Sequence, residues 1–320
     1  MLSAGVVLAA VLCISCGGRT ARPDAGTETH SGDAAGTATA GAGRVSHRLT
    51  MPVPPAMLTS DSARLDYVAQ HYWDSMDLRD TTWIADTAAL EQVYANYLGL
   101  LGHLPEAQAG ERLAAFHGAT EVCPAMRDRL FEVAERYLYD PNSPMRSEGL
   151  YIAVLRWAVS SPSLDEYEKI RPQDQLDMAL RNRPGMTAAD FAYTTADGRT
   201  HRLADFRGER TLLFFYNPDC PDCARVKEYI ASSPTLSPLI AAGRVKVLAV
   251  YTDEDLKLWR ERLPQMPAGW TVGYNTQLHT ARTYDLRAIP CLYLLNARKH
   301  VVLKDAPVEW IEAWLQQNAG

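Results

Sequence analysis

The stretch Thr211–Cys223, TLLFFYNPDCPDC, decides the fold of the C-terminal part of this chain. Its first half is a short apolar run of the kind that a buried central strand shows, and its second half contains turn residues and the start of a helix. Cys220 and Cys223 are three residues apart at this helix start, so they lie on one face and their sulfurs can join. The sequence therefore predicts a redox-active cysteine pair where a buried strand meets a helix.

The residues of this motif have different expected roles. The unsatisfied N–H groups and the positive end of the helix dipole favour a thiolate at Cys220, which makes Cys220 the attacking cysteine. Cys223 is more enclosed by the helix and would resolve the mixed disulfide. Pro221 fits the first turn, where no N–H is needed. Asp219 and Asp222 oppose a thiolate at Cys220, so we predict a reductant and not a strong oxidant.

A Cys-x-x-Cys pair can also have one of two other roles, and both stay open at this point. One is a zinc site, which needs two further ligands. Apart from the two cysteines of the expected signal, Cys13 and Cys16, the chain has no second cysteine pair, and His201 and His279 lack ligand-like spacing, so no metal is expected. The other is an inert disulfide or a pair of buried thiols.

Strand and helix patterns alternate on both sides of the motif. Short apolar runs predict strands, and the segments between them predict helices at 220–232, 253–262 and 277–284. The C-terminal KHVVLKDA and WIEAWLQQ fit an antiparallel edge strand and a covering helix. Residues 184–320 are therefore predicted to form an α/β domain with a central mixed sheet flanked by helices. The strand runs are DFAYTT, TLLFFYN, VKVLAVYT and CLYLLN.

Residues 184–320 resemble the thioredoxin-like domains of the TlpA/ResA type, which are related to the AhpC/TSA group. The resemblance implies a thiol-disulfide oxidoreductase whose redox-active group is a Cys220–Cys223 disulfide, with no other cofactor. It also implies that Pro290 is cis and that Ile289 offers its backbone to a substrate chain beside Cys220. Four pieces carry it in order: Gly185 with Asp190-Phe191 and Asp197-Gly198, then Leu203-Ala204-Asp205-Phe206-Arg207-Gly208, then FFYNPDCPDC, then Tyr284-Asp285-Leu286-Arg287-Ala288-Ile289-Pro290.

This sequence departs from the resembled families at the proton acceptor. Thioredoxins carry a buried acid on the strand before the motif, and the matching residue here is Phe214. ResA-type proteins place a Glu three residues after the second cysteine, and here Val226 stands there. Glu228 could serve only in a different helix register, and its alternative is an ordinary surface charge. The general base for Cys223 is left unassigned.

Other positions bear on alternative activities. A thiol peroxidase of the AhpC/TSA group needs a Thr three residues before the reactive cysteine, where Asn217 stands, and the second cysteine favours disulfide exchange. Cys291 directly follows Pro290 and is expected to be a buried core thiol, with a third redox thiol as the alternative. Cys123 is expected to be a buried thiol as well.

Residues 51–183 have helical periodicity, which predicts an all-α domain of about five or six helices. Tyr72 and Trp73 are expected in its core. The segments His71–Asp74 and Tyr137–Arg146 resemble a domain of unknown function that precedes thioredoxin-like domains in bacterial lipoproteins. That resemblance implies no activity, so a binding or scaffold lipoprotein whose helical domain recognises a partner is the alternative function.

The N-terminus predicts export. Residues 1–15 are an apolar run of signal-peptide length, and Cys16 resembles the lipidated cysteine of a bacterial lipobox. A plain secretory signal or a buried N-terminal helix is the alternative. Residues 16–50 are rich in Gly, Ala, Thr and Ser and predict a flexible linker after the lipidated cysteine.

These features predict a location in the cell envelope, facing the periplasm and anchored to a membrane by lipid. The expected partners are exported proteins with disulfides and an unidentified electron donor. A nucleic-acid partner is not expected, because the formal net charge is −6 and no basic stripe is present.

Overall fold

The structure is a computed structural model and describes residues 47–318. The expected signal segment, Cys16 and nearly all of the expected linker lie outside this range. No helix within residues 47–318 has the length and apolar character needed to cross a membrane.

The first half of the described chain is helical, as its periodicity predicts. The Ser60 side chain accepts a hydrogen bond from the Ala63 N–H and begins the first helix. A capping box of Asp165 and Glu168 begins the last. The expected count of five or six helices was too low, because a helix of one turn shows no periodicity. The helices here are α1 (Asp61–His71), α2 (Thr82–Ala85), α3 (Thr87–Leu101), α4 (Glu106–Ala119), α5 (Pro124–Leu138), α6 (Glu148–Ser160) and α7 (Glu166–Ala179), with a 3-10 turn at Thr120–Val122.

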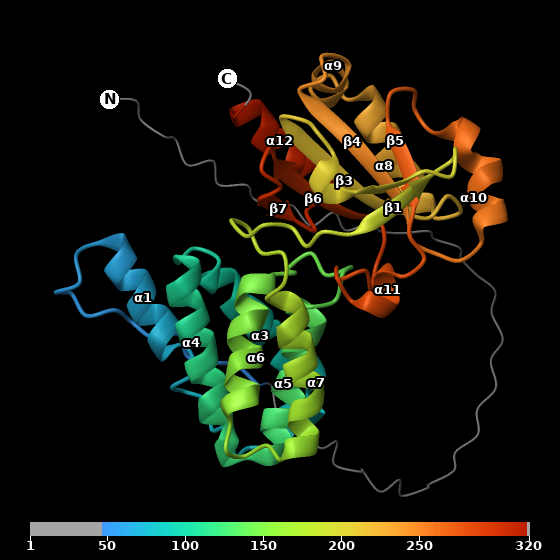
Figure 1. Ribbon diagram of the computed structural model, residues 1–320. Helices are drawn as coiled ribbons and strands as arrows, with labels where there is room; N and C mark the ends of the chain where they lie inside the picture. Colours follow the sequence, from blue (N-terminus) through green and yellow to red (C-terminus); the bar gives the residue numbers. More distant parts are fainter. Residues whose placement is uncertain (1–46, 319–320) are drawn as a thin grey trace, which may run out of the picture. The chain divides into compact units, whose positions relative to one another are not determined.

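Aromatic side chains fill the core of this helical domain. Tyr72 and Trp73 are 3% and 8% exposed, which confirms their expected place in the core. The Trp73 ring stacks on Phe116 with centroids 4.0 Å apart. Buried residues of α3, α4, α5 and α6 complete the cluster, and these helices lie side by side in Figure 1. Burial of such large rings is the main stabilising term for a domain of this kind.

The second half forms one mixed sheet, which confirms the predicted fold class. The strand order is β2-β1-β5-β4-β3-β6-β7; β3, β4 and β5 are parallel, and the other neighbouring pairs are antiparallel. Two strands were not predicted: β2 is exposed along its length, and β5 is four residues long and contains Gly273. The strands are β1 (Ala192–Thr195), β2 (Thr200–Arg202), β3 (Arg210–Tyr216), β4 (Val245–Tyr251), β5 (Thr271–Tyr274), β6 (Cys291–Asn296) and β7 (Val301–Lys304).

Side chains of β3 alternate between two cores, one on each face of the sheet. Leu212 and Phe214 face the core that includes residues of α8 and α12, whereas Leu213 and Phe215 face the core on the other side. Figure 1 shows α8 and α12 beside the central strands. The remaining helices are α8 (Pro221–Ser232), α9 (Leu236–Ala241), α10 (Leu256–Arg262), α11 (Leu278–Ala281) and α12 (Val308–Gln317), with 3-10 turns at Leu203–Asp205 and Leu263–Gln265.

Two of the predicted helices are shorter than expected. α10 starts at Leu256 because the Asp255 side chain accepts from the Lys257 and Leu258 N–H groups and caps the helix there. α11 ends at Ala281, where Arg282 takes up a left-handed backbone conformation with φ 50°. The expected helix at 277–284 is therefore a single turn.

Polar contacts join the helical domain to the sheet domain, and we call them the domain junction. Lys304 at the end of β7 has a side chain that is 5% exposed. Its Nζ donates to the carbonyls of Ala179 and Arg181 at 2.8 and 2.7 Å and lies 2.7 Å from the Glu148 carboxylate. A lysine that satisfies the last carbonyls of a helix stabilises that end, so Lys304 fastens the C-terminus of α7 to the sheet.

Candidate active site

Cys220 lies at the N-cap of α8, directly after the loop that leaves β3. Its Sγ accepts a hydrogen bond from the Cys223 N–H at 3.2 Å. Pro221 is the first residue of the helix, and Asp222 follows it on the exposed surface. The helix end thus supplies an N–H donor and the positive end of its dipole to this sulfur.

Cys223 is in a different environment, although it belongs to the same turn. It is 2% exposed and packs among apolar residues that include Phe214 and Val226. Burial, together with the hydrogen bond to the Cys220 sulfur, raises the pKa of the Cys223 thiol well above its usual range. Cys223 therefore stays protonated at neutral pH as long as Cys220 is a free thiol beside it.

The loop before β6 brings Ile289 and Pro290 to the cysteine pair. The Ile289–Pro290 peptide bond is cis, as the resemblance implies. The Cys220 Sγ lies 3.8 Å from the Ile289 carbonyl oxygen, although the two residues are 69 positions apart in sequence. Both residues of the loop are half-buried, so part of their surface is open to a ligand beside Cys220.

Both aspartates of the motif have a cationic neighbour that the sequence did not predict. Arg262 lies 3.4 Å from the Asp219 carboxylate, and Arg225 lies 3.6 Å from the Asp222 carboxylate. All four side chains are largely exposed, so each pair is worth little in energy, but the net charge beside Cys220 is close to zero. The three-residue spacing of Asp222 and Arg225 on a helix was a readable signal for one of these pairs.

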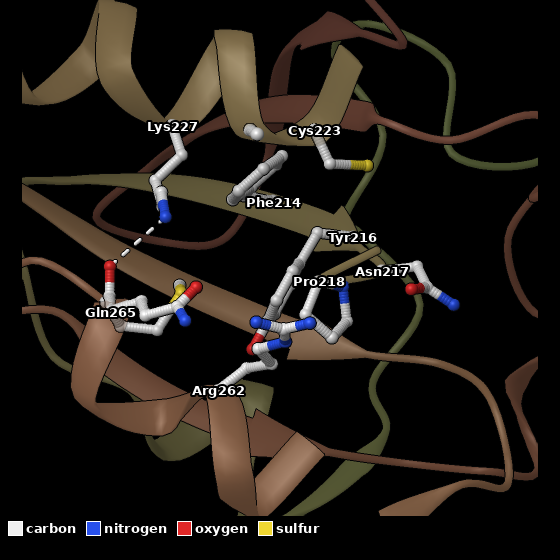
Figure 2. A pocket seen from close by; sticks show the side chains of 10 residues that line it. Phe214, Tyr216, Asn217, Pro218, Cys223, Lys227, Arg262 and Gln265 are labelled. Carbon is white, nitrogen blue, oxygen red and sulfur yellow. Dashed lines mark hydrogen bonds between the residues drawn. The ribbon is translucent and has the colours of Figure 1, made fainter. Parts of the chain in front are cut away.

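A small cavity lies against Cys223 and is lined in part by Phe214. Its volume is about 20 Å³, which is room for about one water molecule. Lys227 lines it, and its Nζ donates to the Gln265 carbonyl at 3.1 Å (Figure 2). Phe214 and Arg262 also line it, and no carboxylate is among the described residues that do.

Glu228 does not take the place of the missing acid. It is exposed on α8, whereas Cys223 and Val226 are buried on the side of the helix that faces the sheet. Glu228 lies five positions after Cys223, which puts the two side chains about 140° apart around the helix axis. The surface-charge interpretation of Glu228 therefore fits the structure, and no carboxylate among the described residues lines the cavity against Cys223.

The Asn217 side chain shapes the loop between β3 and Cys220. Its amide group donates to the Asp253 carboxylate, and its Oδ1 accepts from the Asp219 N–H at 2.9 Å. The Cys220 N–H in turn donates to the Asn217 carbonyl at 3.1 Å. Asn217 thus fixes the position of Cys220 through its neighbours in the loop.

The other two cysteines among the described residues, Cys291 and Cys123, have different surroundings from this pair. Cys291 is fully buried, and burial together with the nearby Asp305 carboxylate raises the pKa of its thiol well above the usual range, so it is a poor redox thiol. Cys123 is half-buried and not fully buried as expected, because it occupies the N-cap position of α5, at the edge of the helical core. His201 stacks on Tyr193, and no group of three or more residues able to hold a metal ion occurs within residues 47–318.

Two protein families match this chain. The family described as Domain of unknown function (DUF5106) matches residues 16–182, which is more than half of the chain. The AhpC/TSA family matches residues 184–304. The two matches meet where the helical domain gives way to the sheet domain.

Known relatives match either most of the chain or little more than a third of it. A crystal structure of a thioredoxin-like protein from Bacteroides caccae is 37% identical, with a TM-score of 0.82, and the match covers 85% of this chain and 99% of that one. The thiol-disulfide oxidoreductase ResA of Geobacillus kaustophilus is 26% identical over 117 residues, 37% of this chain and 66% of the relative. ResA of Geobacillus thermodenitrificans is 27% identical over 112 residues, 35% of this chain and 63% of the relative. The chain thus spans slightly less than two thirds of the length of these ResA proteins.

Proposed function

The chain belongs to the thioredoxin-like proteins of the TlpA/ResA type in which a DUF5106 domain precedes an AhpC/TSA domain, and from this membership we propose that it reduces disulfides by thiol-disulfide exchange. One observation carries the proposal. The reduced Cys220 lies at a helix N-terminus, with the buried Cys223 behind it and the carbonyl of Ile289 beside its sulfur. This is the arrangement that the exchange reaction needs.

The proposed reaction has two steps. The Cys220 thiolate attacks one sulfur of a substrate disulfide, which forms a mixed disulfide and releases the other substrate sulfur as a thiolate. Cys223 then loses its proton to water and attacks the Cys220 sulfur, which forms the Cys220–Cys223 disulfide and releases the second substrate thiol. Two electrons pass to the substrate, and an external dithiol donor restores the reduced pair.

A reducing direction agrees with the surroundings of the pair. Strong oxidants of this fold stabilise the thiolate with a cationic or dipolar neighbour inside the motif. Here the motif residues Pro221 and Asp222 supply no cation, and Arg225 and Arg262 only balance the two aspartates. We therefore expect a reduction potential nearer to that of thioredoxin, about −270 mV, than to that of the oxidant DsbA, about −120 mV.

The proposed setting is the cell envelope, facing the periplasm. The apolar run before Cys16 and the match of Cys16 to a lipobox support export and a lipid anchor to a membrane. The proposed partners are exported proteins with disulfides and an electron donor of the dithiol class. Incorporation of a labelled fatty acid that is lost in Cys16→Ser would support the anchor, and equal incorporation in both would contradict it.

Insulin reduction tests the activity. Residues 47–318 together with a dithiol donor should precipitate the insulin B chain faster than the donor alone. Cys220→Ser should abolish this increase in rate. Cys223→Ser should instead accumulate a mixed disulfide with its substrate, because the resolving thiol is absent. Equal rates for the unchanged chain and Cys220→Ser would contradict the proposed function and favour a scaffold role for the helical domain.

A further inference from the structure

The helical domain reaches the segment that carries Pro290, and this contact has no role in the function proposed above. The loop between α5 and α6 runs from Tyr139 to Ser147. All of it except Ser147 belongs to the segment Tyr137–Arg146. The Arg287 guanidinium lies 3.5 Å from the centre of the Tyr139 ring, and its Nη2 donates to the Tyr139 carbonyl at 3.0 Å. Arg287 also pairs with Asp285. The residues just before Ile289 are thus held from the helical side.

A second contact from the helical domain is made to Asp305, directly after β7. Arg146 Nη1 donates to the Asp305 carboxylate at 2.6 Å, and Nη2 donates to the Asp305 backbone carbonyl at 2.6 Å. Asp305 follows β7 in a left-handed backbone conformation with φ 44°, which a residue other than glycine keeps only when its surroundings hold it. The next residue, Ala306, donates its N–H to the carbonyl of Leu292 in β6.

Asp305 connects Arg146 to the start of β6. Its carboxylate is within hydrogen-bonding reach of the Cys291 thiol, and Cys291 is the residue after Pro290. The Cys291 Sγ also lies 3.7 Å from the Asp285 carbonyl, so it bridges both ends of the loop. A chain of contacts therefore runs from Arg146 through Asp305 and the Ala306–Leu292 hydrogen bond to the start of β6, with Cys291 between Leu292 and the loop that faces Cys220.

The position of this loop matters for the exchange reaction. A substrate disulfide must lie in line with the Cys220 sulfur at about 3–3.5 Å, and small displacements of a reacting group cost large factors in rate. A substrate chain that pairs with the backbone at Ile289 takes its position from that backbone. We propose that Arg146 is a positioning residue: by holding Asp305 and Cys291 it fixes the Ile289–Pro290 loop for protein substrates. This inference rests on the proposed function.

Other contacts already hold the two domains together, so Arg146 is not required for that purpose. Lys304 bonds to Glu148 and to the end of α7, and the Asn182 amide donates to the Thr283 carbonyl at 2.9 Å. Arg282 pairs with Asp174 at 2.9 Å, and this exposed pair is also part of the domain junction. Asp174→Asn removes that pair without touching residues 285–291, so it is the matched control.

The test compares a protein disulfide with a small one. Arg146→Gln should lower kcat for insulin about tenfold or more while leaving the reaction with a small aromatic disulfide nearly unchanged, because the small disulfide needs no backbone pairing. Asp174→Asn should behave like the unchanged chain with both substrates, and Arg146→Lys should recover part of the insulin rate. A merely structural role for Arg146 would lower both rates together, and that result would overturn the proposal.

Hydrogen exchange supplies a measurement that does not depend on activity. In Arg146→Gln, amides of the peptide from Asp285 to Leu292 should exchange roughly tenfold faster, whereas Asp174→Asn should leave them unchanged. Unchanged exchange in this peptide would overturn the positioning role even if insulin turnover fell. No Cys220-dependent turnover by the unchanged chain would instead overturn the proposed function on which this inference rests.

Discussion

The two sides of the Ile289–Pro290 loop differ in the kind of side chain that they meet. On the side of the cysteine pair, the buried neighbours of Cys223 are apolar and include Phe214 and Val226. Behind the loop, Arg146 and Asp305 form a partly buried ion pair beside the Cys291 thiol. The comparison teaches that the carboxylate near the loop lies in the domain junction, whereas no carboxylate lines the cavity against the resolving cysteine. Four sets of variants test this difference between the two sides of the loop.

Moving a carboxyl to the cysteine side should have the largest effect. Phe214→Asp removes a fully buried ring and places an acid in an apolar core. We expect a loss of about 3–5 kcal/mol in the free energy of unfolding, because the cavity and the buried polar group both cost stability. Urea denaturation followed by fluorescence measures this loss. Phe214→Leu is the control and should cost less than half as much; an equal loss would mean that the acid itself is tolerated there.

The two motif cysteines should differ in alkylation rate by about a hundredfold at about pH 8, with Cys220 the faster. The pKa of Cys223 is raised, so its thiolate becomes populated only as the pH rises beyond the range where an ordinary cysteine ionises. Mass spectrometry of the labelled peptides gives the rate at Cys220 in Cys223→Ser and the rate at Cys223 in Cys220→Ser. Similar rates at about pH 8 would show that Cys223 is not protected by burial.

Removing a charge from the domain junction should have a smaller effect. Lys304→Met leaves the Glu148 carboxylate and two carbonyls at the end of α7 without their partner. We expect a loss of about 2 kcal/mol, since partly buried groups lose a charged hydrogen-bond partner while the Glu148 side chain stays 37% exposed. Lys246→Met on β4 removes an exposed lysine and is the control, with an expected change below about 0.5 kcal/mol. Equal midpoints in urea would contradict a stabilising role for Lys304.

Removing both motif aspartates should have the smallest effect. Asp219 and Asp222 are exposed and each lies near an arginine, so their charges are already balanced. The double variant with Asn at both positions should change the rate of Cys220 alkylation by less than about threefold at physiological salt. A roughly tenfold acceleration would show that the aspartates act on Cys220 without compensation, as the sequence pattern alone indicates.

Local patterns were sufficient to predict the cysteine pair and the strand before it. Thr211–Tyr216 is apolar and bounded by turn residues, and the helix that begins at Pro221 has its cysteine cap next to it in sequence. β5 was missed because a four-residue strand that contains glycine has little pattern of its own and depends on β4 for its hydrogen bonds. Residue propensities alone cannot predict a strand that forms only because a neighbouring strand bonds to it.

The environment of the site was harder to predict than its residues. Arg262 reaches Asp219 across 43 positions, and Arg146 reaches Asp305 across 159. Such pairs follow from how the elements pack, which no local pattern encodes. The cis bond before Pro290 was implied by family resemblance alone, since proline in a loop is usually trans.

Lys304 has a consequence for how freely the two domains can be exchanged. All three oxygen partners of its amine come from residues before 182, whereas Lys304 itself ends the outermost strand of the sheet. A chain that starts after Arg183 would keep the lysine and lose every one of these partners. A recombinant between relatives therefore keeps the partners of this lysine only when its helical domain brings an acid and a helix terminus to the same place.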